Sequence, residues 1–492
     1  MPAVPEGPST VPEGPSAVPE GPSAVPERPS AVPGRSSAVP GPDPNRAPRT
    51  AAAGREAALN AETRLAKRLS EAGVHFEGRA YPVSPQPLVL DEAQAGRVTS
   101  AAEALHRVLD RVVDAYLASA EVRRHFPHYL PYSRLLTPPV RLRPAARICR
   151  FDGVTGRDGT YRIMETNTAC PGGVIQNGIT ARLWRQECGP ARGDGPGRSV
   201  PQELETNRYA FTEQLLRSHH EQFGRQAGFA VVVNLHGRFT NEVDWMLAQF
   251  REHGLRAERV EAAELKYRGG RLTWRGSAVD LAYHKLDQLD LVREESAADL
   301  LRAAADGAVC CLNPLISQCV LEDKAVLALL GDERFADVLG LPHAERAVVE
   351  RHVPWTRVVE QRETTGPDGA TVALLDFAAE ARTRLVLKPR HLTRGEGVLV
   401  GRWTDARTWQ SLLGRAARTR DHVVQDYLPL SVRRVAASGA TGGGDMMHGL
   451  DVYLFGGKAV GFQCRASYDP VTNIGRRGVL LPVEVRRSPG HA

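Results

Sequence analysis

The stretch from residue 147 to residue 173, RICRFDGVTGRDGTYRIMETNTACPGG, constrains the fold more than any other part of the chain. It holds two short segments rich in apolar and β-prone residues, one on each side of a polar, glycine-containing turn. The pair Asp158 and Gly159 is typical of the turn in a β-hairpin. We therefore predict two antiparallel strands joined by a short turn, a connection that restricts the backbone conformation of the residues between them.

The hairpin places polar side chains of several kinds on one surface. Arg150 and Asp152 share one face of the first strand, because side chains alternate faces along a strand. By the same rule, Glu165 and Asn167 share one face of the second strand. Folding the hairpin can gather a cation, carboxylates and an amide oxygen, and oxygen ligands of this kind suit Mg²⁺. The alternative is a solvated sheet face with cross-strand ion pairs.

The composition is that of a globular protein. Of the 492 residues, 42% are hydrophobic and 24% are charged, and this length predicts more than one domain. No apolar run of about 18 residues occurs, so we expect no membrane span. The first residues do not read as a signal peptide, so we expect a cytoplasmic protein. The net charge of +6 comes from scattered arginines, which gives no indication of nucleic-acid binding.

Cysteine and lysine usage differ in what they indicate. The seven cysteines show no metal-binding spacing, so we interpret them as small buried residues in a reducing compartment, with a reactive thiol at Cys170 as the alternative.

Of the 63 basic residues, only six are lysines, at positions 67, 266, 285, 324, 388 and 458. Where arginine supplies most of the charge, each lysine is more often kept for a specific task, such as a compact point charge for a phosphate.

Residues 1–50 carry a seven-residue repeat. The motif VPEGPS begins at Val4 and recurs at Val11 and Val18, and a variant, VPERPS, follows at Val25. Proline at this frequency forbids a helix interior, and the segment has few large apolar side chains from which to build a core. We therefore predict a disordered, partly polyproline II tail without a catalytic role. A Pro-recognising partner could bind it.

The rest of the chain divides into three predicted regions. Residues 51–145 form a helical N-terminal region, with apolar residues at helical spacing between 98 and 122. Residues 146–320 hold the hairpin and then alternating helices and strands, the pattern of an α/β unit with a mostly parallel sheet. Residues 321–492 hold strands on both sides of a glycine loop, followed by a helix and another strand, which predicts an α+β nucleotide-binding clamp. We expect one continuous helix over 318–330.

Three features of the last region suit a nucleotide. Lys388 ends an apolar strand and can point a cation at phosphates, and Lys324 adds a second cation. The loop with Gly395 and Gly397 has the backbone freedom to lay N–H groups over phosphates. The strand over 423–428 offers edge backbone groups to adenine and a carboxylate to ribose. Each signal is weak alone, and their order along the chain is the specific one.

That order resembles the ATP-grasp ligases, and within them the circularly permuted branch that includes glutathionylspermidine synthetase. The resemblance covers roughly residues 76–485. In ordinary ATP-grasp enzymes the metal-binding Glu and Asn come last in the chain, whereas the permuted branch carries them first, in an R-x-D…E-x-N motif. Here the motif reads RFD from Arg150 and ETN from Glu165. The resemblance implies a permuted ATP-grasp fold of the α+β class, with an α/β substrate-side domain.

The resemblance also implies roles for individual residues. Arg150 is expected to be catalytic. The expected metal ligands are Asp152, Glu165 and Asn167. The expected ATP-binding residues are Lys324, Lys388, Gly395, Gly397, Gln425, Asp426, Tyr427 and Leu428. The expected substrate-side residues are His284, Lys285, Arg465 and Asn473.

The implied activity is ATP-dependent ligation of a carboxylate to an amine through an acyl phosphate, with ATP and two Mg²⁺ ions as the implied cofactors. The partners would be a small-molecule or peptide carboxylate and an amine acceptor. The family's Tyr-Arg-Arg reads Tyr283-His284-Lys285 here, and its lid sequence is shuffled, so the substrates stay open. Two alternatives remain. One is the same fold used by a peptide-modifying enzyme or a substrate kinase, and the other is a nucleotide-binding scaffold without catalysis.

Overall fold

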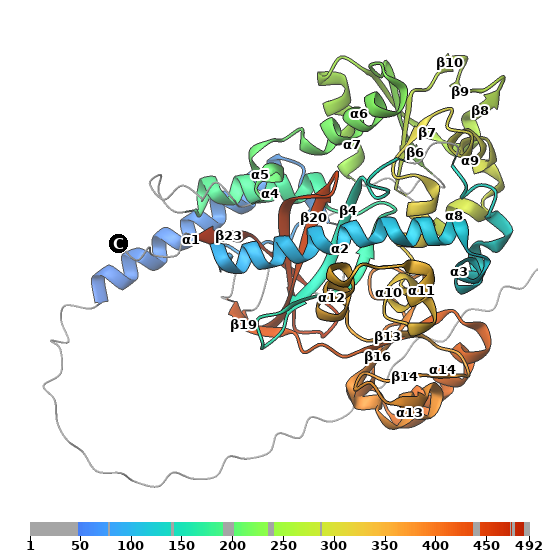
Figure 1. Ribbon diagram of the computed structural model, residues 1–492. Helices are drawn as coiled ribbons and strands as arrows, with labels where there is room; N and C mark the ends of the chain where they lie inside the picture. The colour runs from blue at the N-terminus through green and yellow to red at the C-terminus, as the bar shows by residue number, and fades with distance from the viewer. Residues whose placement is uncertain are drawn as a thin grey trace, which may run out of the picture. The chain divides into compact units, whose positions relative to one another are not determined.

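The computed structural model describes residues 48–76, 79–138, 142–189, 201–234, 241–285, 288–435, 443–472, 474 and 478–486. Residues 1–47 of the predicted repeat tail are not among the described residues. The chain divides into two units, Met1–Ala53 and Gly54–Ala492. Among the described residues, the second unit has three sheets with four or more strands, and their elements are labelled in Figure 1.

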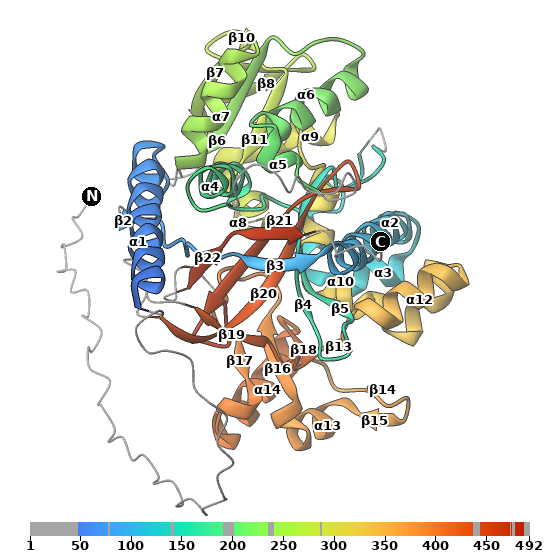
Figure 2. The same ribbon diagram turned by 90° about the vertical axis from the view of Figure 1, so that its left-hand side faces the viewer.

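The central sheet joins the predicted hairpin to strands from the end of the chain. Its strands are β4 (Ile148–Thr155), β5 (Tyr161–Asn167), β19 (Ser431–Val435), β20 (Gly444–Phe455), β21 (Lys458–Ser467) and β22 (Val479–Leu481). β4 and β5 pair antiparallel, and Gly159 in their turn has a φ of +72°. β4 also pairs with β20, so Asp152 lies opposite both Glu165 and Asp451. Figure 2 shows the hairpin beside these C-terminal strands.

Helix α2 (Glu92–Ala118) packs along the central sheet, where Figure 1 shows it crossing in front of β4 and β20. It begins with a capping box, because the Asp91 carboxylate accepts from the Gln94 backbone N–H at 2.7 Å and the Gln94 side chain accepts from the Asp91 N–H at 3.0 Å. Apolar residues such as Val98 and Leu105 recur on one face of the helix and are buried. Helical periodicity in the sequence thus predicts which face packs on the sheet.

A second sheet is parallel throughout, in the order β12-β11-β6-β7. Its strands are β6 (Phe229–Asn234), β7 (Arg256–Glu261), β11 (Leu281–His284) and β12 (Cys310–Cys311). Every residue of β6 is buried, as expected for a strand covered on both faces. The neighbouring helices are α6 (Ala210–Phe223), α7 (Asn241–Glu252), α8 (Gln288–Arg293) and α9 (Ala298–Ala305).

A third sheet is antiparallel, in the order β13-β18-β16-β17. Its strands are β13 (Thr356–Val358), β16 (Leu385–Pro389), β17 (Leu399–Val400) and β18 (His422–Asp426). Helices α13 (Leu374–Glu380) and α14 (Ala406–Thr419) pack on it around the fully buried Trp409. β16 is the apolar strand that the sequence predicts to end near Lys388.

The expected helix over 318–330 is wrong as a continuous element. The structure has one π-helical turn over Ser317–Leu321, and then α10 begins at Ala325 and ends at Leu330. The break occurs because the Asp323 carboxylate accepts from the Ala325 N–H at 2.8 Å and pairs with Arg390 at 2.6 Å. Both members of this ion pair are fully buried. The pair fixes the residue beside Asp323, which is Lys324, close to the end of β16.

The remaining described elements are short or peripheral. The helices are α1 (Pro48–Glu71), α3 (Ala120–His125), α4 (Val174–Glu187), α5 (Glu203–Thr206), α11 (Ala336–Leu339) and α12 (His343–His352). The strands are β1 (His75–Phe76), β2 (Arg79–Ala80), β3 (Leu88–Asp91), β8 (Leu265–Arg268), β9 (Arg271–Trp274), β10 (Ser277–Ala278), β14 (Glu363–Thr365), β15 (Thr371–Ala373) and β23 (Val483–Arg486). None of the helices in the described ranges is long and apolar enough to span a bilayer.

Candidate active site

Asp152 lies at the centre of a buried cluster of charges on the central sheet. Arg150 donates from Nε to Oδ1 of Asp152 at 2.6 Å, and Arg465 donates from Nη2 to Oδ2 at 2.6 Å. Asn167 donates from Nδ2 to Oδ1 at 2.9 Å. Asp152 is only 8% exposed, so the alternative of a solvated sheet face is wrong. Burial alone raises the pKa of Asp152, but the two guanidinium groups outweigh it and lower the pKa to about 2.

Two residues of β20 extend this cluster, and the motifs in the sequence missed both. The Asp451 carboxylate accepts from Nε of Arg465 at 2.8 Å, and burial raises the pKa of Asp451 to about 6. The Tyr453 hydroxyl donates to the carbonyl oxygen of Gly172 at 2.9 Å, and Arg150 donates to the same oxygen at 3.0 Å. The available signal was the segment LDVYLF, in which polar groups alternate with apolar residues of a strand.

Lys324 reaches the second strand of the hairpin. Its Nζ lies 2.9 Å from Oε1 of Glu165, and it also donates to the carbonyl oxygen of Leu392 at 2.9 Å. Burial lowers the pKa of Lys324, but the nearby carboxylates of Glu165 and Glu322 outweigh it, so the pKa is raised and the lysine stays charged. Glu165, which is expected to bind metal, is therefore paired with Lys324, which is expected to bind ATP.

Lys388 reaches the same strand from the third sheet. Its Nζ donates to Oε1 of Gln425 at 2.6 Å and to the carbonyl oxygen of Met164 at 3.4 Å. Burial lowers the pKa of Lys388 to about 8, and the attraction of Glu165 offsets only part of that effect. Two lysines far apart in the sequence thus lie beside β5, next to the carboxylates of the hairpin.

The segment expected to bind adenine begins at Gln425, near the end of β18, and continues to Leu428. Burial raises the pKa of Asp426 to about 6, against the opposing charge of Arg384. The Tyr427 backbone N–H donates to the Arg384 carbonyl oxygen at 2.7 Å, and its ring lies edge-on to Trp403 with 5.5 Å between the centroids. Leu428 follows, half-buried. These contacts fix the position of the Tyr427 backbone and ring just after β18.

The glycine loop between β16 and β17 uses backbone conformations that favour glycine. Gly395 has a φ of +71° and Gly397 a φ of +68°. A Cβ on Gly395 would lie 2.3 Å from Cγ1 of Val471, and one on Gly397 would lie 2.8 Å from Cγ of Pro389. The loop therefore packs closely against the segment after β21 as well as against the end of β16.

The expected substrate-side residues separate in the structure. Arg465 belongs to the Asp152 cluster, as described above. Lys285 forms an ion pair with Glu242, and Glu242 accepts from the backbone N–H of Gly173 at 3.0 Å, which links Lys285 to the loop after the hairpin. His284 is buried in the parallel sheet, and burial lowers its pKa to about 4. Asn473 lies outside the described residues.

The oxygen donors of the hairpin fit a magnesium ion in their chemistry. Across the described ranges, no three His, Cys, Asp or Glu side chains are arranged to hold a metal by themselves. The candidate set instead combines two carboxylates, Asp152 and Glu165, with the amide of Asn167, and the two carboxylates lie opposite each other on β4 and β5. Magnesium usually takes one or two carboxylates and leaves its other positions to water and phosphates. The set fits this ion once the cations that now hold its oxygens turn away.

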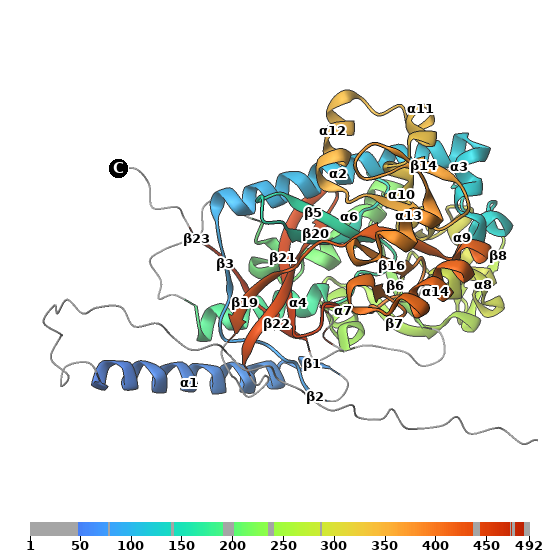
Figure 3. The ribbon, with the colours of Figure 1, turned by 90° about the horizontal axis from the view of Figure 1, so that it is seen from below.

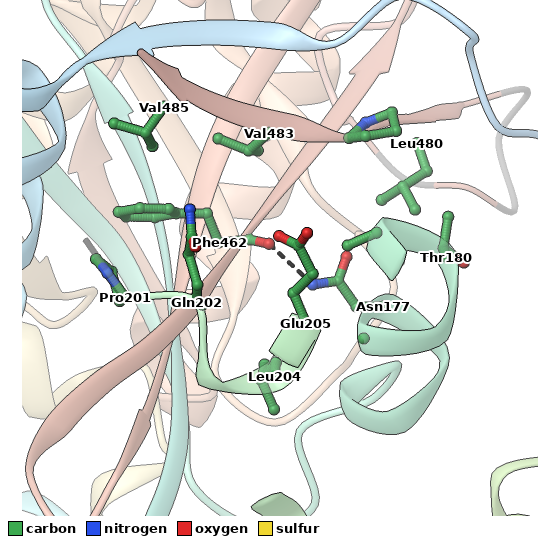
Figure 4. Close-up of a pocket in the computed structure, with 14 residues that line it drawn as sticks. Asn177, Thr180, Pro201, Gln202, Leu204, Glu205, Phe462, Leu480, Val483 and Val485 are labelled. Carbon is green, nitrogen blue, oxygen red and sulfur yellow. Dashed lines mark hydrogen bonds between the residues drawn. The ribbon is translucent and has the colours of Figure 1, made fainter. Parts of the chain in front are cut away.

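A small cavity lies apart from these residues, between α4, α5 and β21. Figure 4 shows it, with the Asn177 side chain donating to the Phe462 carbonyl oxygen at 2.8 Å and Glu205 on its wall. Its volume is about 30 Å³, which leaves room for about two water molecules. It is too small for a substrate.

Comparison with known proteins supports the fold. No family model matches the sequence, and no curated protein matches it. Among solved structures, a glutathione synthetase-like effector from Globodera pallida, in its apo form, has a TM-score of 0.56 at 14% identity, over 87% of this chain and 96% of that one. The chain is similar to it in fold.

Two further structures overlap more loosely. One is a RimK-domain ATP-grasp protein from Sphaerobacter thermophilus, with a TM-score of 0.27 at 18% identity over 49% of this chain and 91% of that one. The other is D-alanyl-alanine synthetase A from Vibrio cholerae, with a TM-score of 0.25 at 9% identity over 51% and 92%. These two overlaps are too loose to carry an argument. The comparison therefore shows that the chain shares the fold of the glutathione synthetase-like effector.

Proposed function

We propose that this chain is an ATP-dependent carboxylate–amine ligase that forms an amide or peptide bond and releases ADP and phosphate. One observation carries the proposal: Lys324 and Lys388, from different elements, both reach the strand that holds Glu165. Two cations beside two carboxylates, in a partly enclosed site, form an arrangement suited to a nucleotide triphosphate with its divalent ion. An ordinary surface ion-pair network would not need buried lysines.

The proposed roles follow from charge. Asp152, Glu165 and Asn167 would hold Mg²⁺, which would supply positive charge to offset the negative charge of the phosphate groups. Lys324 and Lys388 would neutralise the remaining phosphate oxygens, with the glycine loop laying backbone N–H groups over them. The segment from Gln425 to Leu428 would receive adenine and ribose. In this proposal the carboxylates precede the lysines in the chain, as in a circularly permuted ATP-grasp enzyme.

The proposed reaction has two steps. A substrate carboxylate oxygen attacks the γ-phosphorus of ATP, so that a P–O bond forms, the bond to the leaving ADP breaks, and an acyl phosphate results. An amine nitrogen then attacks the acyl carbon, phosphate leaves, and the amine loses a proton. Arg150 would orient the carboxylate and stabilise the oxyanion of the second step, since a guanidinium fork matches such groups. The chain supplies positioning and charge rather than a nucleophile.

Nucleotide binding tests the site before any substrate is known. Asp152 is a poor target because its carboxylate is the shared acceptor of two guanidinium groups, those of Arg150 and Arg465, so Glu165→Gln is the sharper change. We expect wild type to bind ATP more tightly with Mg²⁺ than with EDTA in calorimetry, and Glu165→Gln to lose most of that difference. Asp158→Asn, in the exposed turn of the same hairpin, is the matched control and should keep it. A wild type that binds no ATP in either condition refutes the proposal.

Turnover separates the proposal from its alternatives. ATP and Mg²⁺ are supplied with pools of amino acids, peptides and polyamines, and ADP, phosphate and condensed masses are measured. A condensed product supports the ligase. ADP with a phosphorylated substrate and no condensation favours a substrate kinase, and ADP with a modified peptide favours a peptide-modifying enzyme. Nucleotide binding without any turnover favours a scaffold.

A further inference from the structure

A second cavity has one residue, Gly397, in common with the proposed ATP site. Its volume is about 880 Å³, within the range of about 300–1,000 Å³ that is usual for small-molecule sites. It is bounded by α14, by α8 and by the ends of β16 and β17, and Figure 3 shows α8 and α14 on the same side of the second unit. Lys388 points to the other face of β16, so this cavity is distinct from the phosphate site.

Arginines face this cavity from two elements. Arg407 and Arg415 lie two turns apart on α14, and Arg293 lies on α8. Within the described ranges, none of these three side chains makes an ion pair or a side-chain hydrogen bond. Three exposed arginines thus line one cavity without a partner anion among the described residues.

The other titratable groups on the wall offset only part of that positive charge. Asp421 is the one acidic residue among the described lining residues, and one oxygen of its carboxylate accepts from the Thr419 hydroxyl and lies beside the His422 ring, each at 2.6 Å. Burial lowers the pKa of His391 to about 3 and also lowers the pKa of His128, so both rings are neutral at pH 7. Their rings pack edge-on, with 4.6 Å between the centroids.

The floor of the cavity is apolar. Leu289 and Pro389 are buried there, and Leu399 and Leu412 are partly buried. Leu392 is 48% exposed at the same place. An inorganic anion would satisfy the arginines but leave this surface wet, and a neutral apolar molecule would cover the surface but leave the guanidinium groups without an acceptor.

We propose that this cavity binds a small amphiphilic anion, whose carboxylate or phosphate group is held by Arg407, Arg415 and Arg293 and whose apolar body covers the leucines. Guanidinium groups recognise both head groups by paired hydrogen bonds. Gly397 lines the same cavity, so the occupant contacts the glycine loop from the side opposite Lys388. The binding step itself does not depend on the ligase proposal.

The test is calorimetric titration of the full chain with four probes: octyl phosphate, octanoate, octanol and inorganic phosphate, the amphiphiles kept below their micelle concentrations. We expect one site per chain for octyl phosphate or octanoate, and binding at least about tenfold weaker for octanol and for inorganic phosphate. Whichever anion binds more tightly identifies the head group. Octanol binding as tightly as the anions, or no binding of either anion, overturns the proposal.

Variants locate the binding. Arg407→Ala with Arg415→Ala should weaken binding by about tenfold to a hundredfold, the effect of losing charge-assisted hydrogen bonds. The control with matched charge is Arg351→Ala with Arg418→Ala, two exposed arginines that do not line the cavity. Ser411→Trp, an exposed lining position, should block binding by filling the space.

Hydrogen exchange gives a readout that does not depend on the variants. The bound anion should slow exchange in residues 391–399 and 406–415 and leave the β4–β5 hairpin unchanged. Equal binding by the Arg407/Arg415 variant and its control, or protection elsewhere only, overturns the assignment to this cavity. Because these probes contain no nucleotide, failure here is distinguishable from failure of the ligase proposal.

Discussion

Lys388 is the group whose replacement should stabilise the protein while removing its proposed function. Burial lowers its pKa from 10.5 to about 8, so at pH 7 the folded chain carries a desolvated cation. A shift of this size, fully expressed, corresponds to about 3 kcal/mol of lost stability. The side chain keeps some solvent contact, so we expect solvent screening to reduce the cost to about 2 kcal/mol. Such a cost is reasonable where the cation awaits an anionic ligand.

Lys388→Met removes the charge and keeps most of the stem. It also removes the hydrogen bond to Gln425, which contributes about 1 kcal/mol. The variant should therefore exceed wild type in free energy of unfolding by about 1 kcal/mol at pH 7. Between pH 8 and 10.5 the unfolded lysine keeps its proton and the folded one loses it, so wild-type stability rises with pH in that window. The advantage of the variant should therefore shrink there and then reverse, because by about pH 10.5 the charge cost is gone and the lost hydrogen bond leaves the variant about 1 kcal/mol less stable than wild type.

Urea denaturation without nucleotide at pH 7 and pH 10 measures this difference. Lys458→Met is the control, because that lysine is 77% exposed in a turn and its charge should matter by less than about 0.5 kcal/mol. Adding Mg²⁺ and ATP should then stabilise wild type and leave Lys388→Met nearly unchanged. A variant less stable than wild type at pH 7, or a difference that does not change with pH, refutes the reasoning.

Three further predictions concern other positions. Gly96→Ala should stabilise the chain by about 0.5–1 kcal/mol, because no atom lies near the added Cβ in its helix. Gly178→Ala, also in a helix, should destabilise the chain by about 1–3 kcal/mol, because its Cβ would lie 2.3 Å from a backbone oxygen. Thermal unfolding of the two variants measures both effects. Arg390→Met should cost about 3–5 kcal/mol in urea, since it leaves Asp323 buried without a cation. Asp426→Asn should be more stable than wild type by about 1–2 kcal/mol above pH 6, where the buried carboxyl is forced to ionise, and equal to it below pH 4.

The hairpin shows what strand alternation in the sequence can and cannot predict. Strand alternation predicted that Arg150 and Asp152 share a face, and the structure has them hydrogen-bonded. It did not predict that Asp152 is buried, because Asp451 and Arg465, which lie beside it, come from strands near the end of the chain. Arg465, which the resemblance assigned to the substrate side, is the second donor to Asp152. Contacts this distant in sequence leave no periodic signal near either residue.

The break beside Lys324 shows a different limit. Apolar residues over 318–330 predict a helix, but a buried ion pair between Asp323 and Arg390 overrides that propensity. A single sequence gives no sign that these two residues meet. The strand that carries Lys388 was predicted correctly because its signal is local: a short β-branched and leucine run that ends at a proline.

The charges of the candidate site explain why it can fold without ligands and still receive them. Asp152 and Asp451 neutralise Arg465, and Glu165 neutralises Lys324. Among the described residues, Lys388 makes no ion pair and has only neutral acceptors, so it is the cation that gains most from a phosphate. A divalent ion at Glu165 would release Lys324 for a second phosphate oxygen. Metal and nucleotide binding should therefore reinforce each other. ATP should tighten Mg²⁺ binding in wild type, and Lys324→Met should weaken that coupling while leaving Glu165 able to bind the metal alone.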